Sequence, residues 1–161
     1  MAIRAIITND NEILHKKSRP VQFFDSKLID LLDDMHETLV KVDGVGIAAP
    51  QIGLLRRIIV INHEDRLYEI INPEIVFQKG EQKGQEACLS CPGIYGVVRR
   101  PMVIKINAYD RNGNQYVLKG KDLLARVLSH ELDHLDGILY TDITNEIYKN
   151  KDEKKKKKKR R

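Results

Sequence analysis

The segment His130-Glu131-Leu132-Asp133-His134 constrains the fold of this chain more than any other feature. Residues four apart on a helix lie on one face, so a helix here would let both imidazoles reach one metal ion. Glu131 would sit about 100° further round, close to a metal-bound water without being forced to ligate. Gly137 is a natural stop for a helix over residues 122–136. The alternative is a solvated polar helix, because short matches arise by chance.

Other segments predict what surrounds this helix. Apolar residues at helical spacing favour an N-terminal helix over residues 25–42, which Asp25 or Ser26 can cap and which Gly44 follows. Runs rich in β-branched residues favour strands over 57–62, 67–71, 74–78 and 102–109. Turn residues at 110–114 lead into a further strand over 115–118, as in a hairpin. We therefore predict an α+β fold of mostly antiparallel sheets packed around a central helix that carries the motif, plus the N-terminal helix.

Charge separates the chain into two parts. The chain has 161 residues, of which 42% are hydrophobic, enough for one catalytic domain over residues 1–150 with a core of its own. Residues 151–161 form a basic tail whose last eight residues are all Lys or Arg; without those eight charges the net charge of +5 becomes −3. The tail is either a solvated end or an arm that contacts a polyanion such as the ribosome, and no face for specific DNA binding is expected.

Location follows from what the sequence lacks. It contains no apolar run of membrane-spanning length, and its first residues lack the basic and apolar regions of a signal peptide. We expect a cytoplasmic protein without a membrane partner.

Two cysteines can complete a metal site with the two histidines. If Cys88 and Cys91 both bind, the site is a closed structural one; if one binds, a position stays open for water. The spacing alone leaves both arrangements open. Glu131 would have no purpose in a closed site, and Pro92 and Gly93 shape the loop so that the two thiols need not face the same point.

A glycine- and alanine-rich stretch at residues 44–51 favours close approach of backbone to a ligand, because its side chains are small. Gln51 could present an amide donor there. The alternative is a tight turn with a surface glutamine.

Together these segments resemble the three signature motifs of peptide deformylases. Residues 44–51 match G-x-G-x-A-A-x-Q, and residues 130–134 match H-E-x-D-H. The second motif, E-G-C-L-S, is met at residues 86–90 except that Ala87 replaces glycine. Cys91 also departs from the usual aliphatic residue, and we interpret it as a small buried or half-buried hydrophobe, with redox sensitivity as the alternative. The resemblance covers nearly the whole chain except the tail.

The resemblance implies a role for each matching residue. Cys88, His130 and His134 would bind Fe²⁺, for which Zn²⁺, Ni²⁺ or Co²⁺ can substitute. Glu131 would act as general base and then acid in removing the formyl group from N-formylmethionyl nascent peptides, releasing formate.

The motifs, together with the helix that carries the two histidines, also indicate which residues would hold the substrate. Gln51 and the Leu89 N–H would stabilise the oxyanion beside Gly46. Among the residues near the metal, those expected to line the methionine pocket are Val45, Gly46, Leu123 and Val127. Ordinary core packing is the alternative for Val45, Leu123 and Val127, above all for Leu123.

Two other functions compete. A zinc endopeptidase would use the same helix motif, but no further downstream ligand is evident, and the other two segments would stay unexplained. A structural zinc module with a nucleic-acid-binding tail would leave Glu131 without a task.

Overall fold

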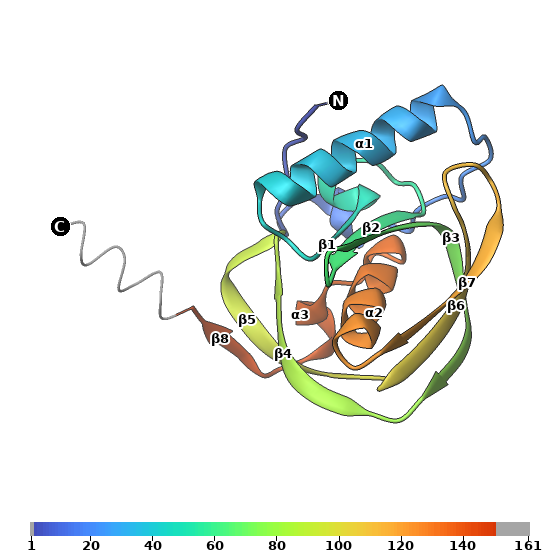
Figure 1. Cartoon of the computed structure of the whole chain (residues 1–161). Coiled ribbons are helices and arrows are strands. Elements are labelled where there is room, and N and C mark those ends of the chain that lie inside the picture. The colour runs from blue at the N-terminus through green and yellow to red at the C-terminus, as the bar shows by residue number, and fades with distance from the viewer. Residues whose placement is uncertain (1, 151–161) are drawn as a thin grey trace.

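Two antiparallel sheets curl around one buried helix, α2, in the computed structural model (Figure 1), which describes residues 2–150. The helical elements are η1 (Glu12–His15), α1 (Ser26–Lys41), η2 (Ala49–Ile52), α2 (Leu123–Leu135) and α3 (Tyr140–Ile143). The strands are β1 (Gly46–Ala48), β2 (Ile58–His63), β3 (Arg66–Lys79), β4 (Gln82–Cys88), β5 (Cys91–Arg100), β6 (Val103–Tyr109), β7 (Gln115–Lys121) and β8 (Ile147–Lys149). The predicted α+β fold around a central motif-bearing helix is confirmed. No helix in the described part of the chain is long and apolar enough to cross a membrane.

The N-terminal helix α1 forms where its caps and apolar spacing predict it. The Asp25 side chain accepts a hydrogen bond from the Leu28 N–H at 3.0 Å, which satisfies a free donor of the first turn. At the other end the left-handed residue is Asp43, with φ 53°, rather than Gly44. The buried face of α1 packs on a cluster of apolar side chains that includes Ile58 and Val60 of β2.

The larger sheet has the strand order β1-β2-β3-β6-β7, and the smaller one has the order β4-β5-β8. The predicted strand over 57–62 and the hairpin of β6 and β7 are present. The two strands predicted over 67–71 and 74–78 are a single strand, β3. Irregular pairing with β6 between Ile71 and Glu74 marks the junction, where Asn72 has φ 50° and Pro73 follows.

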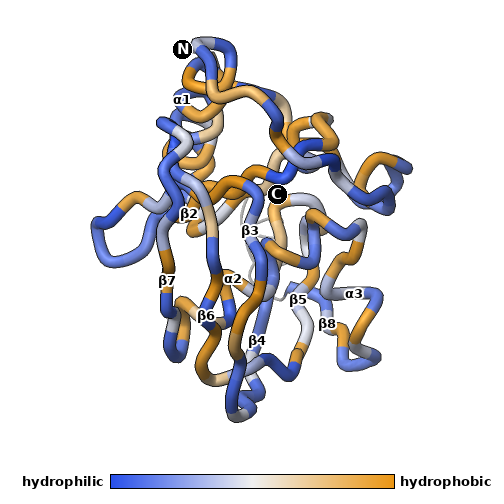
Figure 2. The backbone as a smooth tube through the Cα atoms, turned by 90° about the vertical axis from the view of Figure 1, so that its right-hand side faces the viewer, coloured by the Kyte–Doolittle hydropathy of each residue, from blue (hydrophilic) through white to orange (hydrophobic). Residues whose placement is uncertain are grey.

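The segment around the cysteines is a hairpin, which corrects its interpretation as a loop. Cys88 at the end of β4 pairs with Cys91 at the start of β5, and only Leu89 and Ser90 lie between them. The prediction failed because β4 is mostly hydrophilic (Figure 2) and has no alternating apolar pattern, while β5 contains Pro92 and two glycines. The hairpin fixes Cys88 at the rim of the smaller sheet.

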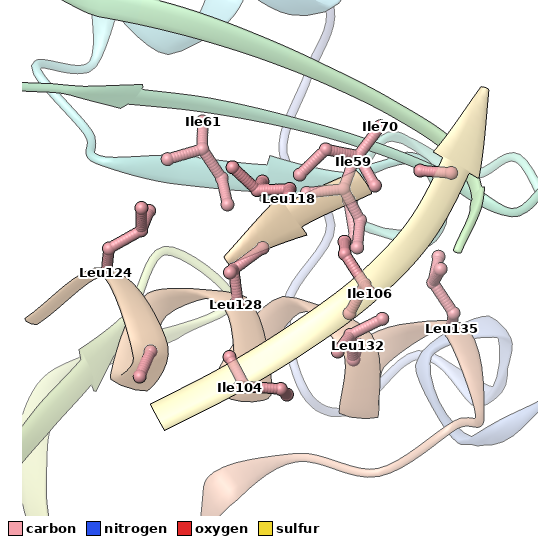
Figure 3. Close-up of a cluster of buried hydrophobic side chains, with 13 residues drawn as sticks. Ile59, Ile61, Ile70, Ile104, Ile106, Leu118, Leu124, Leu128, Leu132 and Leu135 are labelled. Carbon is pink, nitrogen blue, oxygen red and sulfur yellow. The ribbon is translucent and has the colours of Figure 1, made fainter. Parts of the chain in front are cut away.

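Apolar side chains hold α2 against the larger sheet (Figure 3). Leu124, Leu128, Leu132 and Leu135 of α2 meet isoleucines of β2, β3 and β6, all at most 9% exposed. Burying such side chains stabilises the fold by about 1.5–3 kcal/mol each. Gly137 ends the helix at φ 75°, as predicted. The opposite face of α2 presents polar side chains, including Arg126 and His130, to β4 and β5.

Candidate active site

Three metal-binding side chains converge where α2 meets the β4–β5 hairpin. The ring centroids of His130 and His134 lie 5.0 Å apart, and Cys88 Sγ lies 3.3 Å from His134 Nε2. One ligand atom from each residue lies within 4.8 Å of the other two. An imidazole, an imidazole and a thiol at this separation suit a divalent transition-metal ion such as Zn²⁺ or Fe²⁺. The three residues predicted as ligands are therefore brought together.

Cys91 is not a member of this group within residues 2–150. Its side chain is 1% exposed and belongs to a separate apolar cluster with Leu14, Val98, Leu139 and Tyr140. The closed arrangement with two cysteines and two histidines is thus not what the hairpin presents. An arrangement of three protein ligands leaves a coordination position free for a water or a substrate.

Burial favours the metal-binding protonation state of His134 but disfavours that of Cys88. Burial and the charge of His130 lower the pKa of His134 to about 3, so its imidazole is neutral and able to ligate. A hydrogen bond with Cys91, burial and the Glu131 carboxylate raise the pKa of the Cys88 thiol. A bound cation reverses this second effect because it coordinates the thiolate directly.

Glu131 lies beside the ligands with a carboxylate that is buried and incompletely bonded. Its side chain faces Gly46, and Oε2 has no hydrogen-bond partner among the described residues. Burial raises the pKa of Glu131 to about 7. A Cβ atom at position 46 would lie 3.1 Å from Glu131 Oε1, so glycine there lets β1 approach the carboxylate closely. Such a carboxylate can exchange a proton near neutral pH.

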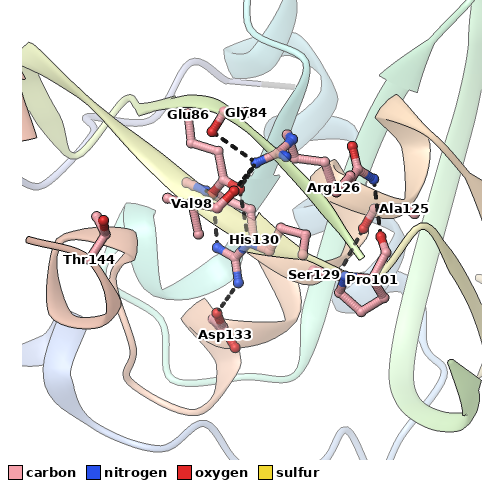
Figure 4. A network of polar contacts seen from close by, with 12 residues as sticks. Gly84, Glu86, Val98, Pro101, Ala125, Arg126, Ser129, His130, Asp133 and Thr144 are labelled. Atoms are coloured by element: carbon pink, nitrogen blue, oxygen red, sulfur yellow. Dashed lines mark hydrogen bonds and ion pairs between the residues drawn. The ribbon is translucent and has the colours of Figure 1, made fainter. Parts of the chain in front are cut away.

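A buried ionic network orients His130 from behind (Figure 4), and sequence reasoning missed it. Glu86 contacts His130 Nδ1 at 2.8 Å and accepts hydrogen bonds from Arg100 at 2.8 and 2.9 Å and from Arg126 at 2.7 Å. Arg100 also donates to Asp133 at 2.6 Å. Burial alone would raise the pKa of Glu86, but the hydrogen bonds from Arg100 and His130 outweigh it and lower that pKa to about 2.

This network decides which nitrogen of His130 is free. An ionised carboxylate only accepts hydrogen bonds, so His130 Nδ1 carries a proton. Against the effect of burial, Glu86 also raises the pKa of His130, so the ring must lose its second proton, from Nε2, before that nitrogen offers a lone pair to a metal. The one signal in the sequence was the place of Glu86 in the second motif; nothing marked Arg100 or Arg126.

Gln51 and Leu89 border the ligand group from two other elements. Gln51 is 1% exposed, so the alternative of a surface glutamine is wrong. Its Oε1 accepts from the Ala48 N–H at 2.9 Å, while Nε2 lies 3.2 Å from Ser90 Oγ and 3.6 Å from Cys88 Sγ. These bonds fix the amide so that its N–H₂ points toward Cys88. Leu89 lies in the two-residue turn after Cys88 and is half-buried.

A cavity of about 400 Å³ opens over these groups. Val45 and Leu123 are 46% and 55% exposed at its rim, so the alternative of core packing for Leu123 is wrong. Val127, one turn before Glu131, lines the cavity and also packs against the apolar cluster between α2 and the larger sheet, so for this residue both interpretations hold. The residues lining the cavity include all those predicted to touch substrate, namely Val45, Gly46, Gln51, Leu89, Leu123, Val127 and Glu131. The cavity is mainly apolar around a polar floor, as small-molecule sites usually are.

Comparison with known proteins gives one consistent result. The polypeptide deformylase family model matches residues 3–150. A peptide deformylase of Caldanaerobacter subterraneus subsp. tengcongensis is 51% identical over 142 residues, which cover 88% of this chain and 89% of the relative.

Solved structures agree. A peptide deformylase of Legionella pneumophila superposes with a TM-score of 0.87 at 41% identity, covering 89% of this chain and 87% of that one. The peptide deformylase of Ehrlichia chaffeensis, solved in complex with actinonin, superposes with a TM-score of 0.88 at 36% identity, and the match covers 90% of each chain. The chain therefore belongs to the peptide deformylase family of metal-dependent hydrolases, which remove the formyl group from N-formylmethionine peptides.

Proposed function

We propose that this chain performs deformylation with Cys88, His130 and His134 as the metal ligands and Glu131 as the proton-transfer group. The observation that supports this most directly is the meeting of three donor atoms within 4.8 Å, two of them on Cys88 and His130, which line the same cavity as Glu131. The substrate is the N-formylmethionyl end of a nascent peptide. The products are formate and a peptide with a free N-terminal amine.

The donor set fits the metal that the family requires. His130 keeps Nε2 free because Nδ1 is engaged by Glu86, and His134 Nε2 already faces Cys88 Sγ. We propose Fe²⁺ as the ion, with Zn²⁺, Ni²⁺ or Co²⁺ able to replace it. When bound, such an ion supplies Lewis acidity and makes water acidic enough to give hydroxide near neutral pH.

Glu131 is proposed to take the proton of the attacking water and later pass it to the departing amine. Both transfers require a group that can change protonation state near neutral pH, and burial gives Glu131 a pKa of about 7. Its Oε2, without a partner among the described residues, is an acceptor available for that water.

Two donors are proposed to stabilise the charge that develops on the formyl oxygen. Gln51 Nε2 is held toward Cys88, and the Leu89 N–H belongs to the tight turn that follows that cysteine. The Gln51 side-chain amide is held by the Ala48 N–H and Ser90, and the Leu89 N–H by the turn, so both need little rearrangement as the charge forms. Removing one such donor typically lowers kcat by about 10²–10³.

The apolar part of the cavity is proposed to take the methionine side chain. Val45, Leu123 and Val127 provide its apolar surface, and Gly46 leaves room next to Glu131. An unbranched thioether adapts to such a pocket, and its burial would contribute about 1.5–3 kcal/mol of binding.

The test is formate release from N-formyl-Met-Ala-Ser by protein purified anaerobically with Fe²⁺. Glu131→Gln should keep the metal and lose nearly all activity, because the amide cannot accept the proton. Glu81→Gln is the matched control, since that carboxylate is exposed and pairs with Arg99 at the surface. Full activity of Glu131→Gln would remove Glu131 from the mechanism, and an inactive parent that holds metal would overturn the proposed function.

Three further proposals concern the chain as a whole. Residues 1–150 are proposed to form one catalytic domain acting in the cytoplasm, where formylated chains leave the ribosome. The basic tail lies outside the described residues, and we propose from its charge that it contacts the ribosome. Deleting residues 154–161 should weaken ribosome co-sedimentation while leaving turnover of the short peptide intact; equal co-sedimentation would refute the tail's role.

A further inference from the structure

Cys91 faces the proposed ligand Cys88 directly across the β4–β5 hairpin. The two residues are register partners of the antiparallel strand pair. Residues opposite one another in an antiparallel pair have Cα atoms about 4.5–5.5 Å apart and side chains on the same face. Disulfides span Cα distances of about 4.4–6.8 Å, so this pair can be bridged with little movement of the backbone.

The two thiols differ in access. Cys88 is half-buried and lines the substrate cavity, whereas Cys91 is 1% exposed beneath it. Cys88 also packs against the apolar cluster that contains Cys91. A small oxidant entering the cavity would therefore meet Cys88 first, with Cys91 in place behind it as the second sulfur. Both cysteines are free thiols in the structure.

We propose that Cys88 and Cys91 form a reversible disulfide when hydrogen peroxide reaches the cavity, and that this bond withdraws Cys88 from the metal-ligand group. The inference rests on the proposed role of Cys88 as a ligand. It makes the hairpin a redox-sensitive element next to the catalytic centre, and it assigns a task to the one cysteine that the deformylation mechanism does not use.

The chemistry balances in two steps. Cys88 sulfur attacks one peroxide oxygen, the O–O bond breaks, and Cys88 becomes a sulfenic acid as the first water leaves. Cys91 sulfur then attacks Cys88 Sγ, the S–O bond breaks, and the leaving hydroxide takes the Cys91 proton as the second water. The two sulfurs lose two electrons and two protons in total, and the peroxide is reduced to two waters. A dithiol restores both thiols by exchange.

The second sulfur decides whether oxidation is reversible. A sulfenic acid without a nearby thiol goes on to sulfinic and sulfonic acids, which dithiols do not reduce. With Cys91 opposite, disulfide formation competes with that further oxidation. We therefore expect the parent protein to recover from peroxide and a variant without Cys91 to be damaged permanently.

The test uses protein loaded with Ni²⁺, which avoids the direct reaction of Fe²⁺ with peroxide. After exposure to hydrogen peroxide, the parent should lose both titratable thiols, lose the mass of two hydrogens and release most of its metal. Dithiothreitol followed by Ni²⁺ should restore all three. Cys91→Val is the matched control; it should gain oxygen mass at Cys88, release metal and stay unrestored.

Two results would overturn the proposal: oxygen addition to the parent without disulfide formation, or equal recovery of parent and Cys91→Val. The metal content of unoxidised Cys88→Ser tests the underlying assignment separately. If Cys88→Ser binds Ni²⁺ like the parent, the ligand role of Cys88 fails. If its metal is lost but the parent forms no disulfide, the ligand role stands and the redox inference alone is refuted.

Discussion

Replacing Glu86 with glutamine removes the charge that two arginines and His130 share in the interior of the protein. Its pKa is lowered from 4.5 to about 2, and a shift of this size corresponds to about 3 kcal/mol of stabilisation. Breaking a buried ion pair by changing one partner independently costs about 3–5 kcal/mol, because the remaining charge stays buried. We therefore expect Glu86→Gln to lose about 3 kcal/mol of unfolding free energy at neutral pH.

The same shift fixes the pH dependence of the effect. Because the folded-state pKa is lower than the unfolded one, the ionised carboxylate stabilises the fold above pH 4.5, and this contribution is lost as pH falls toward 2. The difference in stability between parent and variant should therefore be greatest at neutral pH and should shrink over this acid range.

Urea unfolding of the metal-free proteins, followed by circular dichroism at a series of pH values, measures this difference. Glu81→Gln is the control, because Glu81 and Arg99 are 60% and 66% exposed and such pairs contribute at most about 1 kcal/mol. In the metal-bound form, Glu86→Gln should also weaken metal binding by about 10–100-fold, since His130 loses its charged orienting partner. An ordinary surface substitution changes the unfolding free energy by up to about 0.5 kcal/mol. The reasoning would be refuted if Glu86→Gln differed from the parent by no more than this, or if the difference did not change with pH.

Three other substitutions test single contacts. Gly137→Ala should cost about 2 kcal/mol or more in thermal unfolding, because a Cβ there would lie 2.6 Å from the His15 carbonyl carbon. Gly53→Ala, at φ 88°, should cost only about 1 kcal/mol of backbone strain, because a Cβ there would meet no atom of the described residues within 4 Å. An equal cost at both positions would contradict the role of the contact. Tyr140→Phe should raise the melting temperature, by about 1 kcal/mol of stability, because the buried hydroxyl has no partner among the described residues; a lower melting temperature would show that the hydroxyl is bonded. Gly46→Ala should lower kcat for formate release by roughly ten-fold or more with little change in unfolding, because the methyl group would press on Glu131; an unchanged kcat would contradict this.

Both long helices could be predicted from sequence because local chemistry determines them. Asp25 caps α1, Gly137 ends α2, and apolar residues at helical spacing give each a buried face. The two histidines were equally predictable as a pair, because histidines four residues apart need only a helix to share a face, whereas the choice of Cys88 over Cys91 came from the family resemblance. Gln51 and Val127 reach the cavity as the family motifs and the helix geometry imply.

The β4–β5 hairpin and the ionic network could not be predicted in the same way. Strand β4 forms although its residues are polar, because its backbone pairs with β5 and its few inward side chains meet α2. The partners of Glu86 are fixed by tertiary packing: Arg100 is 14 residues away and Arg126 is 40 residues away in the sequence. A single sequence carries no periodicity that reports such contacts.

The placement of the three ligands also ties metal binding to the folding of the whole domain. Cys88 and His134 are separated by 46 residues, and the intervening chain forms β5, β6 and β7 before it reaches α2. An ion held between them acts as a cross-link that closes a long loop of the unfolded chain, and such loops are costly to close. The site is complete only when the β4–β5 hairpin lies against α2, so metal binding stabilises the folded domain relative to the unfolded chain.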